Sequence, residues 1–257
     1  MLAGAIFSGP ALAWSPARAA GPAAWRAYDT RLRARLADAG GGRFERDFAQ
    51  ALLRLNNAFR AEQQLAPYRW DEGLAEAARA HAADMTARDF FGHEAPEGFT
   101  PFDRASLLAR DLCGPIAENV AWRSDDRRPS NPRQFEDLWE TSPGHRRNLL
   151  REDYTHAGYG VVRVGAKYVA AGVYGGEEIR LPAPLPMRLA SGEELVGLLN
   201  GSVERLAITA PGENPRNAGA PPTIPPVLSP GVWQLRPMKA TAPLMYSVLA
   251  GPVFFVG

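Results

Sequence analysis

Two hydrophobic periodicities follow one another along this chain, and together they limit the folds open to it. Between Phe44 and Glu62 apolar residues recur every three or four positions, which predicts an amphipathic helix with one buried face. Residues 157–164 and 167–175 are instead β-rich runs, and the short Gly-Ala step between them predicts a hairpin. Helices followed by a hairpin predict an α+β domain from about residue 43 to residue 176.

The stretch between the first helix and the hairpin predicts a second helix, a loop-rich region and a third helix. Asp71 is a good N-cap residue, and the helix after it is expected to run to Asp89. Glycine and proline recur between Phe90 and Val120, so we expect loops there, with one short helix near residues 102–109. Residues 132–141 can form another short helix, which we expect to end at a Pro-Gly break just before His145.

We divide the chain into three parts. Residues 1–42 begin with an apolar stretch ending in small residues, typical of an export signal, and continue into a short charged helix; a plain Ala-rich tail is the alternative, because the basic residues usual in such signals are missing. Residues 43–180 hold the predicted α+β domain. Residues 181–257 contain many prolines between short apolar segments, and we expect a small β-rich appendage, mostly of strands. Its compact core is expected to draw on Trp233, Tyr246, Phe254 and Phe255.

Composition narrows the function classes. The formal net charge is +1 and the arginines are scattered among acids, which gives no electrostatic case for binding nucleic acid. Cys113 is the only cysteine, so an intramolecular disulfide and a cysteine-based zinc finger are both excluded. The apolar start is too short to span a bilayer, and no transmembrane helix is expected in the mature chain. An export signal would make the protein secreted or periplasmic.

The four histidines fall into two groups. His81 lies on the apolar stripe of the second helix, where a buried, hydrogen-bonded structural role is expected, and His156 is interpreted as structural or solvent-facing. His93 and His145 lie in loop-like breaks beside glycine, and two such histidines from distant positions can converge. A carboxylate beside them would complete a metal site or an acid/base pair. Glu118 lies inside an apolar run, which predicts either a buried pair or a functional pocket.

The order of these motifs resembles the CAP superfamily in its bacterial form, the SCP-like extracellular proteins related to cysteine-rich secretory proteins. Six blocks carry the resemblance in order: LLRLNNAFRAEQQLAPYRWDEGLAEAARAHAADM, FFGHEAPEGFTPFDR, IAENVAW, LWETSPGHRRNLL, AGYGVV and YVAAGVYG. The resemblance covers residues 43–176 and neither the first 42 residues nor the tail. It implies a CAP-type α-β-α sandwich with an open central cleft.

In many relatives two His and two Glu line that cleft, and in some they bind zinc or another divalent metal. Carried over by motif, the resemblance assigns His93, Glu118 and His145 to this metal-binding set, with Asn119 and Ser142 as pocket neighbours. Glu118 is then a third ligand or a hydrogen-bond acceptor behind the histidines. Ser142 is expected to hydrogen-bond in the pocket or to cap the turn.

Two departures from the family pattern bear on the site. Ala117 replaces the usual Gly before Glu118, and the second Glu is replaced by Ser142, three residues after Trp139. Glu136 and Glu140 flank Trp139, but the position after the Trp points about 100° away from it on a helix. We assign neither to the site, so two His and one Glu are expected.

Three functions remain open from the sequence. The first is a secreted or periplasmic binding module whose cleft accepts a ligand (a lipid, a peptide or an envelope component) and a divalent metal. The second is a hydrolase or peptidase, metal-assisted or using Ser142 with His145, although no Gly-x-Ser-x-Gly elbow and no His-Glu-x-x-His helix is present. The third is a cell-envelope interaction protein acting through residues 181–257. A structural role for the His93, Glu118 and His145 trio is the alternative to all three.

Overall fold

The computed structural model describes residues 21–199, 201, 203, 205–213, 224–242 and 245–257, so the predicted export signal lies outside the described residues. The helices, in chain order, are α1 (Pro22–Asp38), the 3-10 turn η2 (Ala39–Gly41), α2 (Arg46–Glu62), α3 (Glu72–Ala87), α4 (Pro101–Leu108), α5 (Pro132–Thr141), α6 (Pro143–Leu149) and α7 (Gly192–Leu199). The strands are β1 (Arg43–Phe44), β2 (Arg69–Trp70), β3 (Leu112–Cys113), β4 (Ile116–Ser124), β5 (His156–Val164), β6 (Lys167–Gly175), β7 (Ile179–Arg180), β8 (Arg188–Leu189), β9 (Arg205–Thr209), β10 (Gly231–Ala242), β11 (Met245–Val248) and β12 (Val253–Val256).

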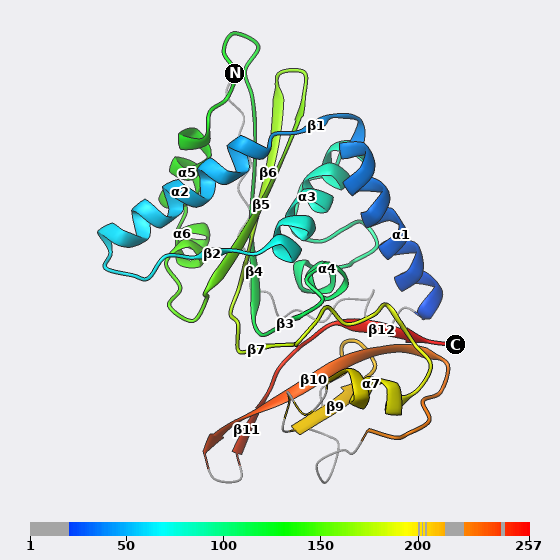
Figure 1. Ribbon diagram of the computed structural model, residues 1–257. Coiled ribbons are helices and arrows are strands. Elements are labelled where there is room, and N and C mark those ends of the chain that lie inside the picture. The colour runs from blue at the N-terminus through cyan, green and yellow to red at the C-terminus, as the bar shows by residue number, and fades with distance from the viewer. Residues whose placement is uncertain (1–20, 200, 202, 204, 214–223, 243–244) are drawn as a thin grey trace.

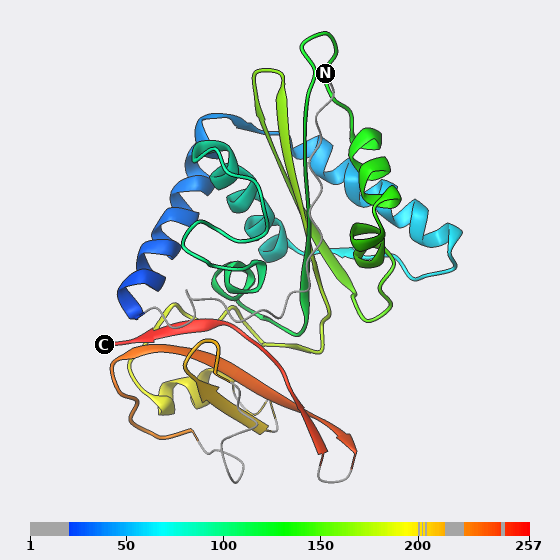
Figure 2. The ribbon, with the colours of Figure 1, turned by 180° about the vertical axis from the view of Figure 1, so that it is seen from behind.

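The central sheet has the strand order β1-β5-β6-β4, and β2 pairs with the same edge of β5 as β1 does. The predicted hairpin is confirmed: β5 and β6 pair antiparallel from His156 opposite Gly175 to Val164 opposite Lys167. Gly165 makes the turn at a positive φ of 57°, which glycine adopts without steric cost. Figures 1 and 2 show this sheet between two helical layers, which makes an α+β sandwich.

One helical layer, formed by α1, α3 and α4, packs on the sheet through small residues. An ideal Cβ placed on Gly158 would lie 2.1 Å from the backbone nitrogen of Ala75, and one on Gly160 would lie 2.2 Å from that of Arg79. The missing side chains therefore let α3 lie directly against β5. Helix α3 begins as predicted at the N-cap Asp71, whose carboxylate accepts the Leu74 N–H at 2.8 Å.

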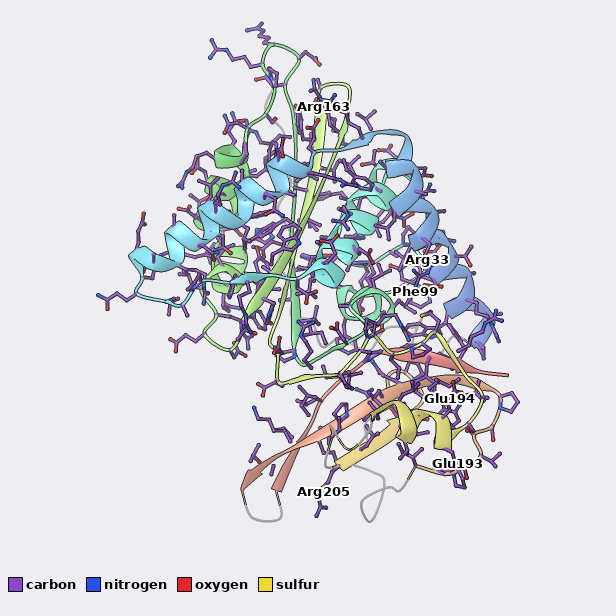
Figure 3. All side chains as sticks on the ribbon, viewed as in Figure 1. Arg33, Phe99, Arg163, Glu193, Glu194 and Arg205 are labelled. Atoms are coloured by element: carbon purple, nitrogen blue, oxygen red, sulfur yellow. The ribbon has the colours of Figure 1, made fainter. Side chains whose placement is uncertain are left out.

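Helix α1 belongs to the same core, although its sequence is strongly charged. Trp25, Tyr28 and Leu32 are buried in one cluster with residues of α3. Phe99, in the loop before α4, stacks on Tyr28 with ring centroids 4.0 Å apart (Figure 3). The short helix expected before residue 43 thus covers one face of the sandwich.

The opposite layer, formed by α2, α5 and α6, covers the other face of the sheet. Its buried residues include Phe48 and Leu52 of α2 and Phe135 and Trp139 of α5. They meet alternate residues of the strands, such as Tyr159 of β5. The buried stripe expected for residues 44–62 is confirmed, and Trp139 is fully buried in this core.

Two local expectations were wrong. Residues 116–120 were expected within a loop-rich region, but they begin β4, which pairs with β6 along its whole length. The predicted Pro-Gly break is a new helix, α6, because a proline in the first turn lacks only an amide hydrogen that has no helical partner there. His145 therefore lies on a helix, not in a loop.

The C-terminal residues form a second sheet with the order β11-β10-β12-β8, and β9 pairs with β10. The predicted β-rich appendage is present, but residues 192–199 form α7, which carries the exposed Glu193 and Glu194 (Figure 3). Phe254 is buried in a core of this unit, Trp233 packs at its side, and Phe255 reaches into the core of the α1–α3 layer. The side chain of Tyr246 lies outside the described residues. In the described part of the chain no helix is long and apolar enough to cross a membrane.

Candidate functional site

The residues assigned by motif gather around β4, the edge strand of the central sheet. Ile116 and Val120 belong to the α3-side core, whereas Ala117 and Ala121 belong to the α5-side core. Because side chains alternate along a strand, Glu118 faces the α3 and α4 layer and Asn119 faces the α5 and α6 layer. The edge strand thus directs one polar side chain into each layer.

Glu118 is a fully desolvated carboxylate with a fully buried cationic partner. Arg104 of α4 donates from Nη2 to Glu118 Oε2 at 2.7 Å, and both side chains are 0% exposed. Burial would raise the pKa of Glu118, but the charge of Arg104, with contributions from the neighbouring His81 and His93, lowers it to about 2. Glu118 is therefore ionised at neutral pH, and Arg104 compensates its charge.

His93, in the loop after α3, contacts the other oxygen of Glu118. Its Nδ1 lies 3.0 Å from Glu118 Oε1, and 18% of its side chain is exposed. An ionised carboxylate can only accept a hydrogen bond, so Nδ1 carries the proton in this contact. In the neutral imidazole Nε2 is then the nitrogen with the lone pair. Arg104 also donates to the His93 carbonyl at 2.8 Å, which fixes the loop.

His145 reaches the same place from the opposite layer. Its ring centroid lies 6.5 Å from that of His93, with an angle of 61° between the rings. Asn119 Nδ2 donates to the His145 carbonyl at 3.2 Å, and Asn148 Nδ2 donates to Asn119 Oδ1 at 2.9 Å. The structure therefore brings His93, Glu118, Asn119 and His145 together at one strand edge.

His81 is also close to Glu118, although sequence reasoning gave it only a structural role. Its Nε2 lies 2.8 Å from the Gly92 carbonyl and 3.7 Å from Glu118 Oε1, and the longer distance exceeds a hydrogen bond. Burial first, and then the charge of Arg104, lower the pKa of His81 to about 3, so it is neutral. Its contact with Glu118 is not an ion pair, and the expected buried, hydrogen-bonded role is confirmed.

Ser142 marks the junction of two helices. It is the C-cap of α5 and the N-cap of α6, and its carbonyl accepts the Arg146 N–H at 2.8 Å. Its hydroxyl makes no capping hydrogen bond, so the expected side-chain cap is wrong. Its backbone, rather than its side chain, sets the turn that positions His145 three residues later.

Sequence reasoning missed two buried charged residues. Arg104 lies on the buried side of α4 with Leu107 and Leu108, and the three- and four-residue spacing was the signal that could have found it. Glu136 lies three residues before Trp139 and so shares its buried face of α5. Arg104 was not singled out from the sequence, and Glu136 was not assigned to the site.

The positions of His93, His145 and Glu118 limit how a metal ion could bind here. Among the described residues no cluster of three or more His, Cys, Asp or Glu side chains has metal-binding geometry. Two imidazoles on one tetrahedral zinc would have ring centres roughly 5 Å apart, so His93 and His145, at 6.5 Å, must approach each other to share an ion. Glu118 already accepts from Arg104 and His93, so it fits the role of an outer acceptor better than that of a direct ligand.

A family model described as CAP, the cysteine-rich secretory protein family, matches residues 53–174. This match spans a little under half of the chain. Two Bacillus subtilis relatives match it: the uncharacterized protein YkwD, 31% identical over 119 residues, and the uncharacterized membrane protein YlbC, 36% identical over 112 residues. These matches cover 46% and 44% of this chain but only 44% and 31% of the relatives.

A solved structure of an extracellular protein containing a SCP domain, from Bacillus anthracis, is 28% identical to this chain. It superposes with a TM-score of 0.43 over 50% of this chain and 41% of its own. The part of the present chain that matches the CAP family model runs from within α2 to β6 and includes the strand edge that carries Glu118.

Proposed function

We propose that this CAP domain is a secreted or periplasmic binding module whose cleft lies at β4 between His93 and His145. The contact of His93 Nδ1 with Glu118 Oε1, at 3.0 Å, carries the proposal. A buried carboxylate behind an imidazole fixes the ring's orientation and its tautomer, as it does behind metal-bound histidines. His93, 18% of whose side chain is exposed, would then offer an imidazole nitrogen to a ligand or to a divalent cation such as zinc, and the buried His145 would join it by moving towards His93.

His93 and His145 would hold the cation, and Glu118 would support His93 from behind. A bound divalent metal would supply a Lewis-acidic centre with open positions, which suits the capture of an anionic or carbonyl group of a ligand. The buried cation of Arg104 opposes a further positive charge nearby, so affinity should be lower than at a closed structural zinc site. No catalytic step is assigned to these residues.

Calorimetric titration with Zn²⁺ tests the proposal. Wild type should bind one ion, and His93→Ala and His145→Ala should each lose that binding while keeping a melting transition. His156→Ala is the matched control, because His156 lies away from the cleft against Thr155 and Glu177. Lowering the pH through the imidazole range should weaken binding, since a protonated imidazole cannot ligate. Equal binding by all four proteins would reject the pair as ligands.

A further inference from the structure

A cavity lies at the opposite edge of the central sheet from His93 and His145. Along β5 the edge is covered only at its two ends: β2 pairs with His156 and Ala157, and β1 pairs with Val162 and Arg163. A cavity of about 320 Å³ opens between these two short strands. In Figure 1 the start of α2 lies beside β5, between the labels β1 and β2.

Half of the ten residues that line this β1–β2 cavity are apolar, and three of those five are aromatic. Phe44 of β1 and Trp70 of β2 come from its two ends, and Tyr159 and Val161 of β5 lie between them. Two separated aromatic side chains favour a flat ligand, because aromatic rings pair by stacking or edge-to-face contact. The volume lies at the small end of the range for ligand sites, which suits about two fused rings.

The polar lining carries two glutamates, Glu45 and Glu72, and two arginines, Arg46 and Arg79. Glu72 of α3 is held by Arg79 at 2.6 Å, and Glu45 is held by Arg43 at 2.7 Å. Arg46 also lines the cavity, and among the described residues no ion pair engages it. Its guanidinium is therefore available for a planar anion such as a carboxylate, which it can bind through two parallel hydrogen bonds.

The start of α2 adds to this positive potential. Arg46 is its first residue, and the N-cap Glu45 makes no capping hydrogen bond with its side chain. The amide groups of the first turn and the helix dipole therefore favour an anion at this end. By contrast, Asp71 caps the neighbouring α3 with its own carboxylate.

We propose that the β1–β2 cavity binds a small aromatic carboxylate, with its rings between Phe44 and Trp70 and its carboxylate on Arg46. The site is separate from the cleft at β4, because the two lie at opposite edges of one sheet. The inference does not depend on metal binding by His93 and His145.

Binding of 2-naphthoate, measured by calorimetry and by the NMR shift of the Trp70 indole N–H, tests the proposal. Wild type should bind it, and Arg46→Gln should bind about tenfold more weakly or worse, because a charge-assisted hydrogen bond is lost. Arg54→Gln is the matched control: Arg54 is exposed on the same helix and does not line the cavity. It should bind as wild type does.

Two further ligands separate charge from shape. 2-Naphthalenemethanol, which has the rings without the charge, and octanoate, which has the charge without the rings, should both bind more weakly than 2-naphthoate. Equal binding of the alcohol would overturn the anionic class, and equal binding of octanoate would overturn the aromatic one. No binding of 2-naphthoate by wild type, or undiminished binding by Arg46→Gln, would overturn the site itself. None of these results bears on Zn²⁺ binding by the cleft, so the two proposals fail independently.

Discussion

Two glutamates are buried on opposite faces of the same sheet, and their surroundings differ in one respect. Glu118 on β4 has Arg104 at 2.7 Å, whereas Glu136 on α5 has no hydrogen-bond partner for either carboxylate oxygen among the described residues. The pKa of Glu118 is lowered to about 2. Burial first, and then the neighbouring charge of Glu140, raise the pKa of Glu136 to about 8. Equal burial therefore leaves one glutamate charged and the other largely protonated near neutral pH.

The comparison explains why one face of the sheet can support a polar site. A charge kept permanently in the interior requires a compensating partner, and Arg104 supplies it on the α4 side. On the α5 side the carboxyl is within electrostatic range of the buried Tyr159 and Tyr174, and its charge would raise their pKa values further. The charged Glu118 can thus accept the hydrogen bond that orients His93, whereas Glu136 stays neutral in the core on the α5 side.

The largest effect is expected when the paired glutamate loses its partner. Arg104→Met should lower the unfolding free energy by about 3–5 kcal/mol, because an ionised Glu118 would remain buried and uncompensated. Urea denaturation at pH 7 measures the change. The double variant Arg104→Met/Glu118→Leu should recover much of the loss, since both charges are then gone. A double variant as unstable as the single one would show that packing, not charge, is the cause.

A loss of unfolding free energy of similar size, but independent of charge, is expected when Trp139, near Glu136 on α5, is replaced. Trp139 is fully buried, and its indole lies 6.1 Å from the ring of Tyr159. Trp139→Ala should cost roughly 3–5 kcal/mol by leaving a cavity, and the cost should be the same at pH 6 and pH 8. A loss under about 1 kcal/mol in thermal or urea unfolding would contradict the burial of this side chain.

A smaller, pH-dependent effect is expected from Glu136 itself. Its folded pKa, about 8, lies above the ordinary glutamate value of 4.5, so folding takes up a proton between these values. Its contribution to stability is complete below the unfolded pKa and is lost as pH rises through the folded one. Between pH 6 and pH 8 the loss is at most about 1.4 kcal/mol per pH unit.

Urea denaturation of wild type and Glu136→Leu at pH 6, 7 and 8 isolates this contribution. The unfolding free energy of the variant should not fall over this pH range, because leucine carries no ionisable group into the core. The stability of the variant relative to wild type should therefore increase as pH rises. Asp126→Leu serves as the control, since Asp126 is an exposed carboxylate in the loop before α5. Parallel pH profiles for wild type and Glu136→Leu would mean that Glu136 does not titrate in the core.

The difference between the two glutamates also marks what the sequence could predict. The helical stripes of α2 and α3, the Asp71 cap and the β5–β6 hairpin depend on local periodicity and turn chemistry, and all four were predicted. Glu118 was singled out because it lies within the mostly apolar run IAENVAW. Its partner Arg104 lies on another element, and only the tertiary fold brings the two together.

The burial of Glu136 was not predicted from the sequence, for a related reason. It lies among Gln134, Asp137 and Glu140, so its local sequence is that of a solvated helix face. Only its helical spacing from Trp139 indicates burial, and no local signal shows that a partner is missing. The separation of His93 and His145 was likewise beyond the sequence, because α6 was expected as a turn.

The smallest effect is expected from a charge on the exposed side of α5. Arg133 contacts Asp137 at 2.6 Å, with both side chains 53% exposed, so Arg133→Gln should change stability by no more than about 0.5 kcal/mol at pH 6. Arg133 also lowers the pKa of Glu136, so removing its charge should raise that pKa further and move the pH-dependent decline to higher pH. The displacement is measurable in the urea profiles, and it should vanish in a Glu136→Leu background. A displacement that persists without Glu136 would assign the effect to Glu140, whose pKa Arg133 also lowers.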